Sequence, residues 1–161
     1  MSYDLRLFRT ADGVSLETLT EAIELHAEDD GPNPAPMLRP ISNGELATLH
    51  AALRAAEPSL EGPTDELFGG DDLPITISLM SDEVGYSIPY WYEGAEARET
   101  VMRIAALLAI CREHGLRIYD PQIGREIIDP QAELAQITDV YTYGTRSLRS
   151  VLARRPWWKF W

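Results

Sequence analysis

Residues 75–92 read ITISLMSDEVGYSIPYWY, and the pattern of this stretch decides the fold. Apolar residues occupy every second position on both sides of Ser81-Asp82-Glu83, which predicts two β-strands joined by a turn into a hairpin. Pro89 lacks the backbone N–H that a central strand donates to its neighbour. The second strand is therefore expected to end near Ile88 or to contain a bulge at the proline.

Periodic segments flank the hairpin on both sides. The first, from Tyr3 to Arg9, alternates apolar and polar residues as a strand does, with Phe8 as an exception on the outward face. Helices are predicted after Ser15, after Ser42 or Asn43, over residues 95–114 and over about 131–141. Further extended pieces are predicted at 116–119 and 127–128, and a loop with room for a short edge strand at 58–74.

This order of elements predicts an α+β fold. A strand, two helices, a hairpin, a long helix and a further strand match the split β-α-β arrangement called ferredoxin-like. Its right-handed crossovers place the helices on one face of an antiparallel sheet. The other face would be a mixture of polar, charged and aromatic residues that a C-terminal helix or a partner is expected to cover. Those residues are Arg6, Phe8, Thr76, Ser78, Met80, Ser87, Trp91, Arg117 and Tyr119.

Residues 1–145 are expected to form this single α+β domain. Residues 146–161 form a basic, aromatic C-terminal tail that follows a helical extension. Its last part, PWWKFW at 156–161, holds three of the four tryptophans and the only lysine, and we call it the aromatic segment. Because Pro156 cannot continue a helix, the aromatic segment is expected to pack on the domain or on a partner.

The net charge of −12 is spread unevenly and restricts the class of partner. Residues 1–100 carry 20 acidic residues against 5 arginines, whereas residues 101–161 carry 6 acidic residues against 9 basic ones. An acidic body repels phosphate, so neither nucleic acid nor an anionic membrane surface is expected as the main partner. A basic protein surface would be attracted.

Segment composition predicts a cytoplasmic protein. No apolar run approaches the ~20 residues that span a bilayer, so no stable membrane insertion is expected. The opening residues MSYDLRLFRT are charged where a signal peptide is apolar. The single cysteine, Cys111, cannot form an internal disulfide, which suits a reducing compartment.

The sequence predicts no catalytic, cofactor or metal site. Ser87 lacks the second glycine of the nucleophile elbow, and Cys111 lies on the apolar stripe of a helix, where packing is the expected role. His26 with Asp29 or Asp30 offers two metal ligands where a site needs more. Carboxylates are plentiful, so a hydrolase or transferase that uses surface carboxylates stays open as an alternative.

The aromatic end of the hairpin, SIPYWYEG, is the most partner-like part of the body. Three consecutive aromatic residues cannot all face the core of a strand, so at least one is expected to be exposed or covered by the tail. Aromatic residues beside acids suit a binding surface for a basic protein. The predicted partner-binding residues are Glu83, Tyr90, Trp91, Glu93, Trp157, Trp158 and Trp161.

Two segments carry a resemblance to a family: the opening SYDLRLF and GLRIYDPQ at residues 115–122. They resemble small uncharacterised bacterial proteins that begin with an SYDL-type strand and contain a helix followed by GLxxYDPQ. Several such acidic proteins are similar to the immunity partners of secreted toxins. The resemblance implies no catalytic residue.

These observations favour a non-enzymatic bacterial protein-binding module, of which an immunity-type inhibitor of a toxin is one form. A small hydrolase or transferase is the first alternative. A self-associating structural protein is the second, in which the tail of one copy docks on another to form a homodimer. Trp beside basic residues also marks bilayer interfaces, but the acidic body and the short apolar face of residues 146–155 disfavour a membrane-surface role.

Overall fold

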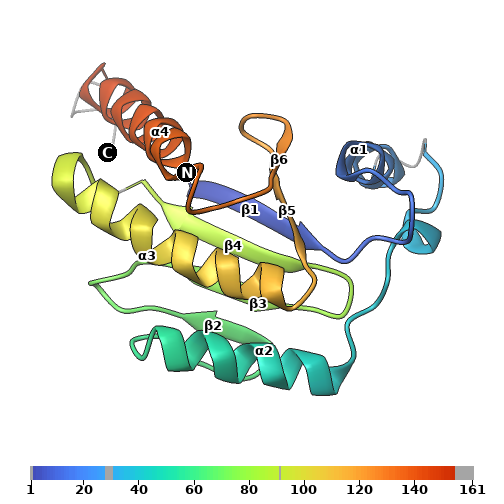
Figure 1. The fold of residues 1–161 in the computed structure, drawn as a ribbon. Helices are drawn as coiled ribbons and strands as arrows, with labels where there is room; N and C mark the ends of the chain where they lie inside the picture. The colour runs from blue at the N-terminus through green and yellow to red at the C-terminus, as the bar shows by residue number, and fades with distance from the viewer. Residues whose placement is uncertain (1, 28–30, 91, 155–161) are drawn as a thin grey trace, which may run out of the picture.

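The structure, a computed structural model, describes residues 2–27, 31–90 and 92–154 (Figure 1). Its strands and helices follow one another in an order typical of an α+β fold. The strands are β1 Ser2–Phe8, β2 Glu66–Phe68, β3 Thr76–Leu79, β4 Val84–Pro89, β5 Arg117–Asp120 and β6 Arg125–Ile127. The helices are α1 Leu16–Ala27, α2 Asn43–Ala56, α3 Gly94–Glu113 and α4 Leu134–Arg154, with a short 3₁₀ turn, η1, at Ala35–Met37.

All six strands join one antiparallel sheet in the order β2-β3-β4-β1-β5-β6. The predicted hairpin is confirmed, because β3 and β4 pair from Thr76 opposite Ser87 to Leu79 opposite Val84. β4 ends at Pro89, as its missing N–H predicted, and Pro89 has a partner only on the β1 side, at Ser2. The loop at 58–74 contains β2, the short edge strand.

Three helices cover one face of the sheet. The inward residues of β1, β3 and β4 form the main core with α2, α3 and α4. Figure 1 shows α2 and α3 lying side by side across this face. The capping box between Ser42 and Glu45 starts α2, since each side chain accepts a hydrogen bond from the other residue's backbone N–H.

α1 packs on the opposite face, which corrects the expectation that all helices share one face. Phe8 follows the inward Leu7, so its ring points the other way, where it is buried against Leu16 and Leu19 of α1. Tyr119 packs against the same cluster. The outward phenylalanine that looked anomalous in the sequence is the anchor for α1.

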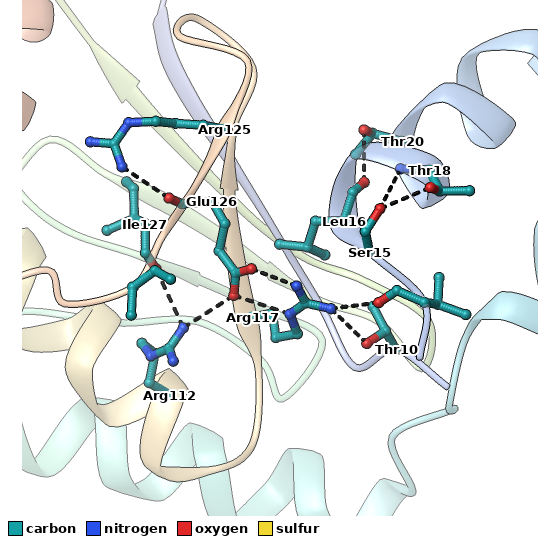
Figure 2. Close-up of polar contacts among 12 residues, drawn as sticks. Thr10, Ser15, Leu16, Thr18, Thr20, Arg112, Arg117, Arg125, Glu126 and Ile127 are labelled. Atoms are coloured by element: carbon teal, nitrogen blue, oxygen red, sulfur yellow. Dashed lines mark hydrogen bonds and ion pairs between the residues drawn. The ribbon is translucent and has the colours of Figure 1, made fainter. Parts of the chain in front are cut away.

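Arg117 attaches this second layer to the sheet. Its guanidinium donates to both carboxylate oxygens of Glu126 on β6, to Thr10 Oγ1 at 3.1 Å and to the Val14 carbonyl at 2.7 Å (Figure 2). Arg112 of α3 reaches the same carboxylate at 3.5 Å. The Arg117 guanidinium thus joins the β5–β6 pair to the chain that leads into α1.

α4 is longer and more regular than predicted. The expected helix over about 131–141 continues without a break from Leu134 to Arg154, through Gly144 and into the tail that was expected to begin at residue 146. A Cβ at Gly144 would lie 2.3 Å from Cε1 of Tyr90. Gly144 therefore allows the close approach of an aromatic ring and does not end the helix.

Cys111 lies in the middle of the core with no exposed surface. It pairs with the Tyr86 hydroxyl at 3.1 Å, and burial raises the pKa of its thiol to about 12. The expected packing role on the apolar stripe of α3 is confirmed.

Candidate protein-binding surface

An apolar hollow of about 390 Å³ opens between α4, the end of β4 and the turn after β5. We call it the α4 hollow. Tyr143 at its rim is 74% exposed, more than any other large hydrophobic side chain that the structure describes. The hollow is lined by Tyr90, Gln122, Val140, Tyr143, Gly144, Ser147 and Leu148.

The floor beneath Tyr90 is built from tyrosines held in fixed positions. The ring centroids of Tyr90 and Tyr141 are 5.5 Å apart, and those of Tyr141 and Tyr3 are 6.3 Å apart in a T-shaped arrangement. The Tyr141 hydroxyl donates to the Pro89 carbonyl at 2.8 Å and accepts from the Tyr92 N–H at 3.4 Å. The first of these bonds joins α4 to the last residue of β4, beside the hollow.

A buried carboxylate lies beside this floor. Asp120 has no exposed surface, and its Oδ2 accepts from the Tyr3 hydroxyl while Oδ1 accepts from the Gln122 backbone N–H at 2.9 Å. With its amide nitrogen turned inward, Gln122 also donates to Oδ1 at 2.8 Å and to the Asp4 carbonyl at 2.9 Å. The Tyr3 hydroxyl and the backbone and side-chain N–H groups of Gln122 thus all donate to this one carboxylate.

Burial raises the pKa of the Asp120 carboxyl above its usual range, and its hydrogen bonds oppose that rise. Burial, followed by the charge of Asp120, also raises the pKa of Tyr3 well above its ordinary value, so the Tyr3 hydroxyl remains a donor at every physiological pH. The two segments that carry the family resemblance, SYDL and YDPQ, meet through this pair.

The structure separates the predicted partner-binding residues. Glu83 precedes β4 and Tyr90 follows it, so the two lie at opposite ends of a strand about 20 Å long. Glu83 is bound by both nitrogens of the Arg6 fork at 2.7 and 2.8 Å, and the Arg6 guanidinium also covers the ring of Phe8. Glu83 therefore stabilises the second face of the sheet and does not adjoin the hollow.

Tyr90 and Glu93 do lie together with α4. Tyr90 lines the α4 hollow, and Glu93 forms an ion pair with Arg149 of α4 at 3.0 Å, with both side chains partly exposed. Trp91, Trp157, Trp158 and Trp161 lie outside the described residues.

Sequence reasoning missed the α4 side of the hollow. Val140, Gly144 and Leu148 recur at every fourth position, which places them along one face of a continuous helix. The signal was present in the sequence, but the predicted helix was ended at about residue 141, which separated Val140 from Gly144 and Leu148. Gln122 joins this face only through the tertiary fold.

A second hollow of about 320 Å³ lies near the start of α3 and is polar. Tyr92, Thr100 and Arg103 line it together with three acidic residues: Asp72, Glu96 and Glu99. Arg103 is engaged structurally, because it donates to the Glu57 carboxylate at 2.9 Å and to the Asp72 carbonyl at 2.7 Å. The three acidic residues of this second hollow are exposed to solvent.

Across residues 2–27, 31–90 and 92–154, no three His, Cys, Asp or Glu side chains gather closely enough to hold a metal ion. None of the helices in that same part of the chain is long and apolar enough to cross a lipid bilayer. Comparison of the chain with family models, with known proteins and with solved structures yields no match.

Proposed function

We propose that the protein is a non-enzymatic binding module for another protein, and that the α4 hollow is the centre of its docking surface. The observation that carries the proposal is the apolar hollow with the exposed Tyr143 at its rim. Interface hot spots combine an apolar pocket with tyrosine, tryptophan or arginine. Here the exposed tyrosine lies on a long helix, and a part-buried hydrogen bond from the Tyr141 hydroxyl to the Pro89 carbonyl joins that helix to the end of β4.

The partner we propose is a basic protein in the cytoplasm. The net charge of −12 favours encounter with a positive surface and disfavours nucleic acid. The family resemblance suggests an immunity-type inhibitor, with a toxin as the partner.

The fold that we propose for the centre of the molecule is ferredoxin-like. The strand order β3-β4-β1-β5, with every neighbour antiparallel and helices connecting β1 to β3 and β4 to β5, supports this interpretation. β2 and β6 then extend the four-stranded sheet at its two edges.

Self-association is the second candidate function, because an apolar hollow also suits a second copy of the chain. Light scattering separates the two candidates, since self-association through the hollow predicts a mass that doubles with concentration. A Leu148→Asp change would return that mass to 18.1 kDa.

The test of partner binding uses a photo-crosslinking amino acid placed at Tyr143. In cells of the native host, we expect one discrete adduct at this position. The same amino acid at Met102, which is exposed on α3, is the matched control and should give none. An adduct pattern that is the same at both positions, or that survives Leu148→Asp, would exclude the α4 hollow as the docking surface.

A further inference from the structure

The α4 hollow has a candidate occupant within the same chain. α4 ends at Arg154, and the aromatic segment begins two residues later with three tryptophans and a phenylalanine. A cavity of about 150 Å³ already holds a benzene ring. A hollow of about 390 Å³ can therefore accept an indole.

The aromatic segment can reach the hollow without leaving its own molecule. At 1.5 Å per residue, Leu148 lies roughly 9 Å and Val140 roughly 21 Å before Arg154 along the axis of α4. An extended chain covers about 3.3 Å per residue, so Trp158 can return to the level of Leu148, and Trp161 to that of Val140. Pro156 favours this course, because it cannot continue the helix past Arg155.

The chemistry of the two surfaces also matches. The wall of the hollow is apolar at Val140 and Leu148, while Asp4 lies close enough to Tyr90 for its negative charge to act on that hydroxyl. Lys159 lies between the tryptophans of the aromatic segment and carries the complementary charge. A tether that spans the distance raises the effective concentration to the millimolar range, which favours the segment of the same molecule over that of a second copy.

We propose that the aromatic segment of the same molecule folds back along α4 and seats Trp158 or Trp161 in the α4 hollow. An external partner at this surface then competes with a resident tryptophan. The docked segment also shields the apolar wall of the hollow until that partner arrives.

Nuclear magnetic resonance of the purified full chain tests this placement. In the wild type, ring currents should shift the methyl signals of Val140 and Leu148 upfield. A chain with Trp157, Trp158 and Trp161 all changed to Ser should lose that shift, and a matched chain with all three changed to Phe should keep part of it. The shift should also persist unchanged over a hundredfold dilution.

Three outcomes would overturn the proposal. Identical methyl signals in the wild type and the Ser variant would show that the hollow is empty. Signals that change only far from Val140 and Leu148 would place the segment elsewhere. A shift that fades on dilution together with a halving of the mass would assign the hollow to a second copy.

A variant on the other side of the contact guards against misfolding of the Ser chain. Leu148→Asp should move the indole N–H signals of the aromatic segment toward their solvent-exposed positions, whereas Met102→Asp, at an exposed position of α3, should leave them in place. Indole signals that ignore Leu148→Asp would contradict docking in the hollow. All of these spectra use the purified chain alone, so their result is independent of whether an external partner exists.

Discussion

At the scale of the residue, the buried Asp120 depends on its donors. A carboxylate with no exposed surface loses its water, and only hydrogen bonds and nearby charge replace that solvation. The Tyr3 hydroxyl is the donor that comes from farthest away along the chain, 117 residues distant. It therefore connects the first strand to the turn after β5 as well as stabilising the charge.

Replacing Tyr3 by Phe tests this dependence. The change should lower the free energy of unfolding by about 1–3 kcal/mol at pH 7, because a buried carboxylate loses a donor. The Tyr3 hydrogen bond lowers the pKa of Asp120, so its removal raises that pKa further above the ordinary 3.8. A raised folded-state pKa loses stability as pH rises through it, and the deficit of the variant should therefore grow from pH 4 to pH 7.

Urea denaturation of both proteins across this pH range measures the effect. Tyr92→Phe is the matched control, because its hydroxyl bonds the Asp71 carbonyl at an exposed site. The control should show a small, pH-independent change. A Tyr3→Phe deficit that stays constant or shrinks toward pH 7 would refute the assigned role of the pair.

At the scale of the element, α4 and the end of β4 make their closest contact at Gly144, where the Tyr90 ring lies against the helix backbone. Tyr90 occupies the space that a Cβ at position 144 would fill, with its Cζ only 2.4 Å from that point. Glycine in a helix costs about 1 kcal/mol relative to alanine. The contact of Tyr90 with the backbone of α4 offsets that cost.

The double-mutant cycle of Gly144 and Tyr90 measures this balance. Gly144→Ala alone should fail to stabilise the protein, because the added methyl displaces the Tyr90 ring. In a Tyr90→Ala background the same change should stabilise it by about 1 kcal/mol, the ordinary helix propensity difference. Urea denaturation of the wild type, the two single variants and the double variant gives the coupling free energy between the two positions. If Gly144→Ala changed the free energy of unfolding equally in both backgrounds, the close approach of Tyr90 to Gly144 would be contradicted.

The contribution of Glu126 on β6 to the free energy of unfolding should depend on pH. The hydrogen bonds from Arg117 hold the pKa of Glu126 below its usual 4.5, so its contribution is present above that value and is lost as pH falls through the folded-state pKa. Glu126→Gln should cost about 1 kcal/mol at pH 7, since both partners are partly exposed, and the difference should vanish in acid.

Asp12→Asn is the control for this change, because its ion pair with Arg39 is largely exposed and contributes little. Thermal unfolding of the three proteins between pH 7 and pH 3.5 compares them. A Glu126→Gln deficit that does not shrink as the pH falls would show that the charge of Glu126 is not what stabilises the β5–β6 pair.

At the scale of the whole molecule, the two faces of the sheet differ in the number of buried apolar side chains that hold their helices. The main core joins α2, α3 and α4 to all six strands, while the second cluster holds Phe8, Leu16 and Leu19 under a single helix. Local stability follows the density of buried apolar contacts. The molecule should therefore open first on the α1 side.

Native-state hydrogen exchange should resolve that opening. Backbone amides of α1 should exchange with a free energy below that of global unfolding and with little dependence on urea. Amides in the middle of α3 should exchange only through global unfolding. Equal free energies and equal urea dependence in the two helices would indicate one cooperative unit.

Local patterns predicted the elements better than their placement. The hairpin and α3 follow from alternation and from helical spacing, which are properties of consecutive residues. The side of the sheet that α1 covers depends on Phe8. Its outward ring predicts that some segment packs on that face, but not which segment. Gly144 shows a similar limit, because only the position of Tyr90 distinguishes a glycine that admits a ring from one that ends a helix.

The candidate site was predicted in part for the same reason. Tyr90 and Glu93 were identified from the aromatic end of the hairpin, and both lie beside α4. Glu83 was grouped with them by sequence proximity, although a strand places its two ends far apart. The contribution of Gln122 arises where the turn after β5 meets α4, which no local pattern encodes.

The complete burial of Cys111 makes the reactivity of its thiol a measure of how often the protein unfolds. A thiol with no exposed surface and a pKa of about 12 cannot react with an alkylating reagent while the core is closed. It is also the single cysteine of the chain, so modification leaves one unambiguous mass. The rate of alkylation, followed by mass spectrometry inside living cells, would therefore count how often the native protein unfolds in its own environment.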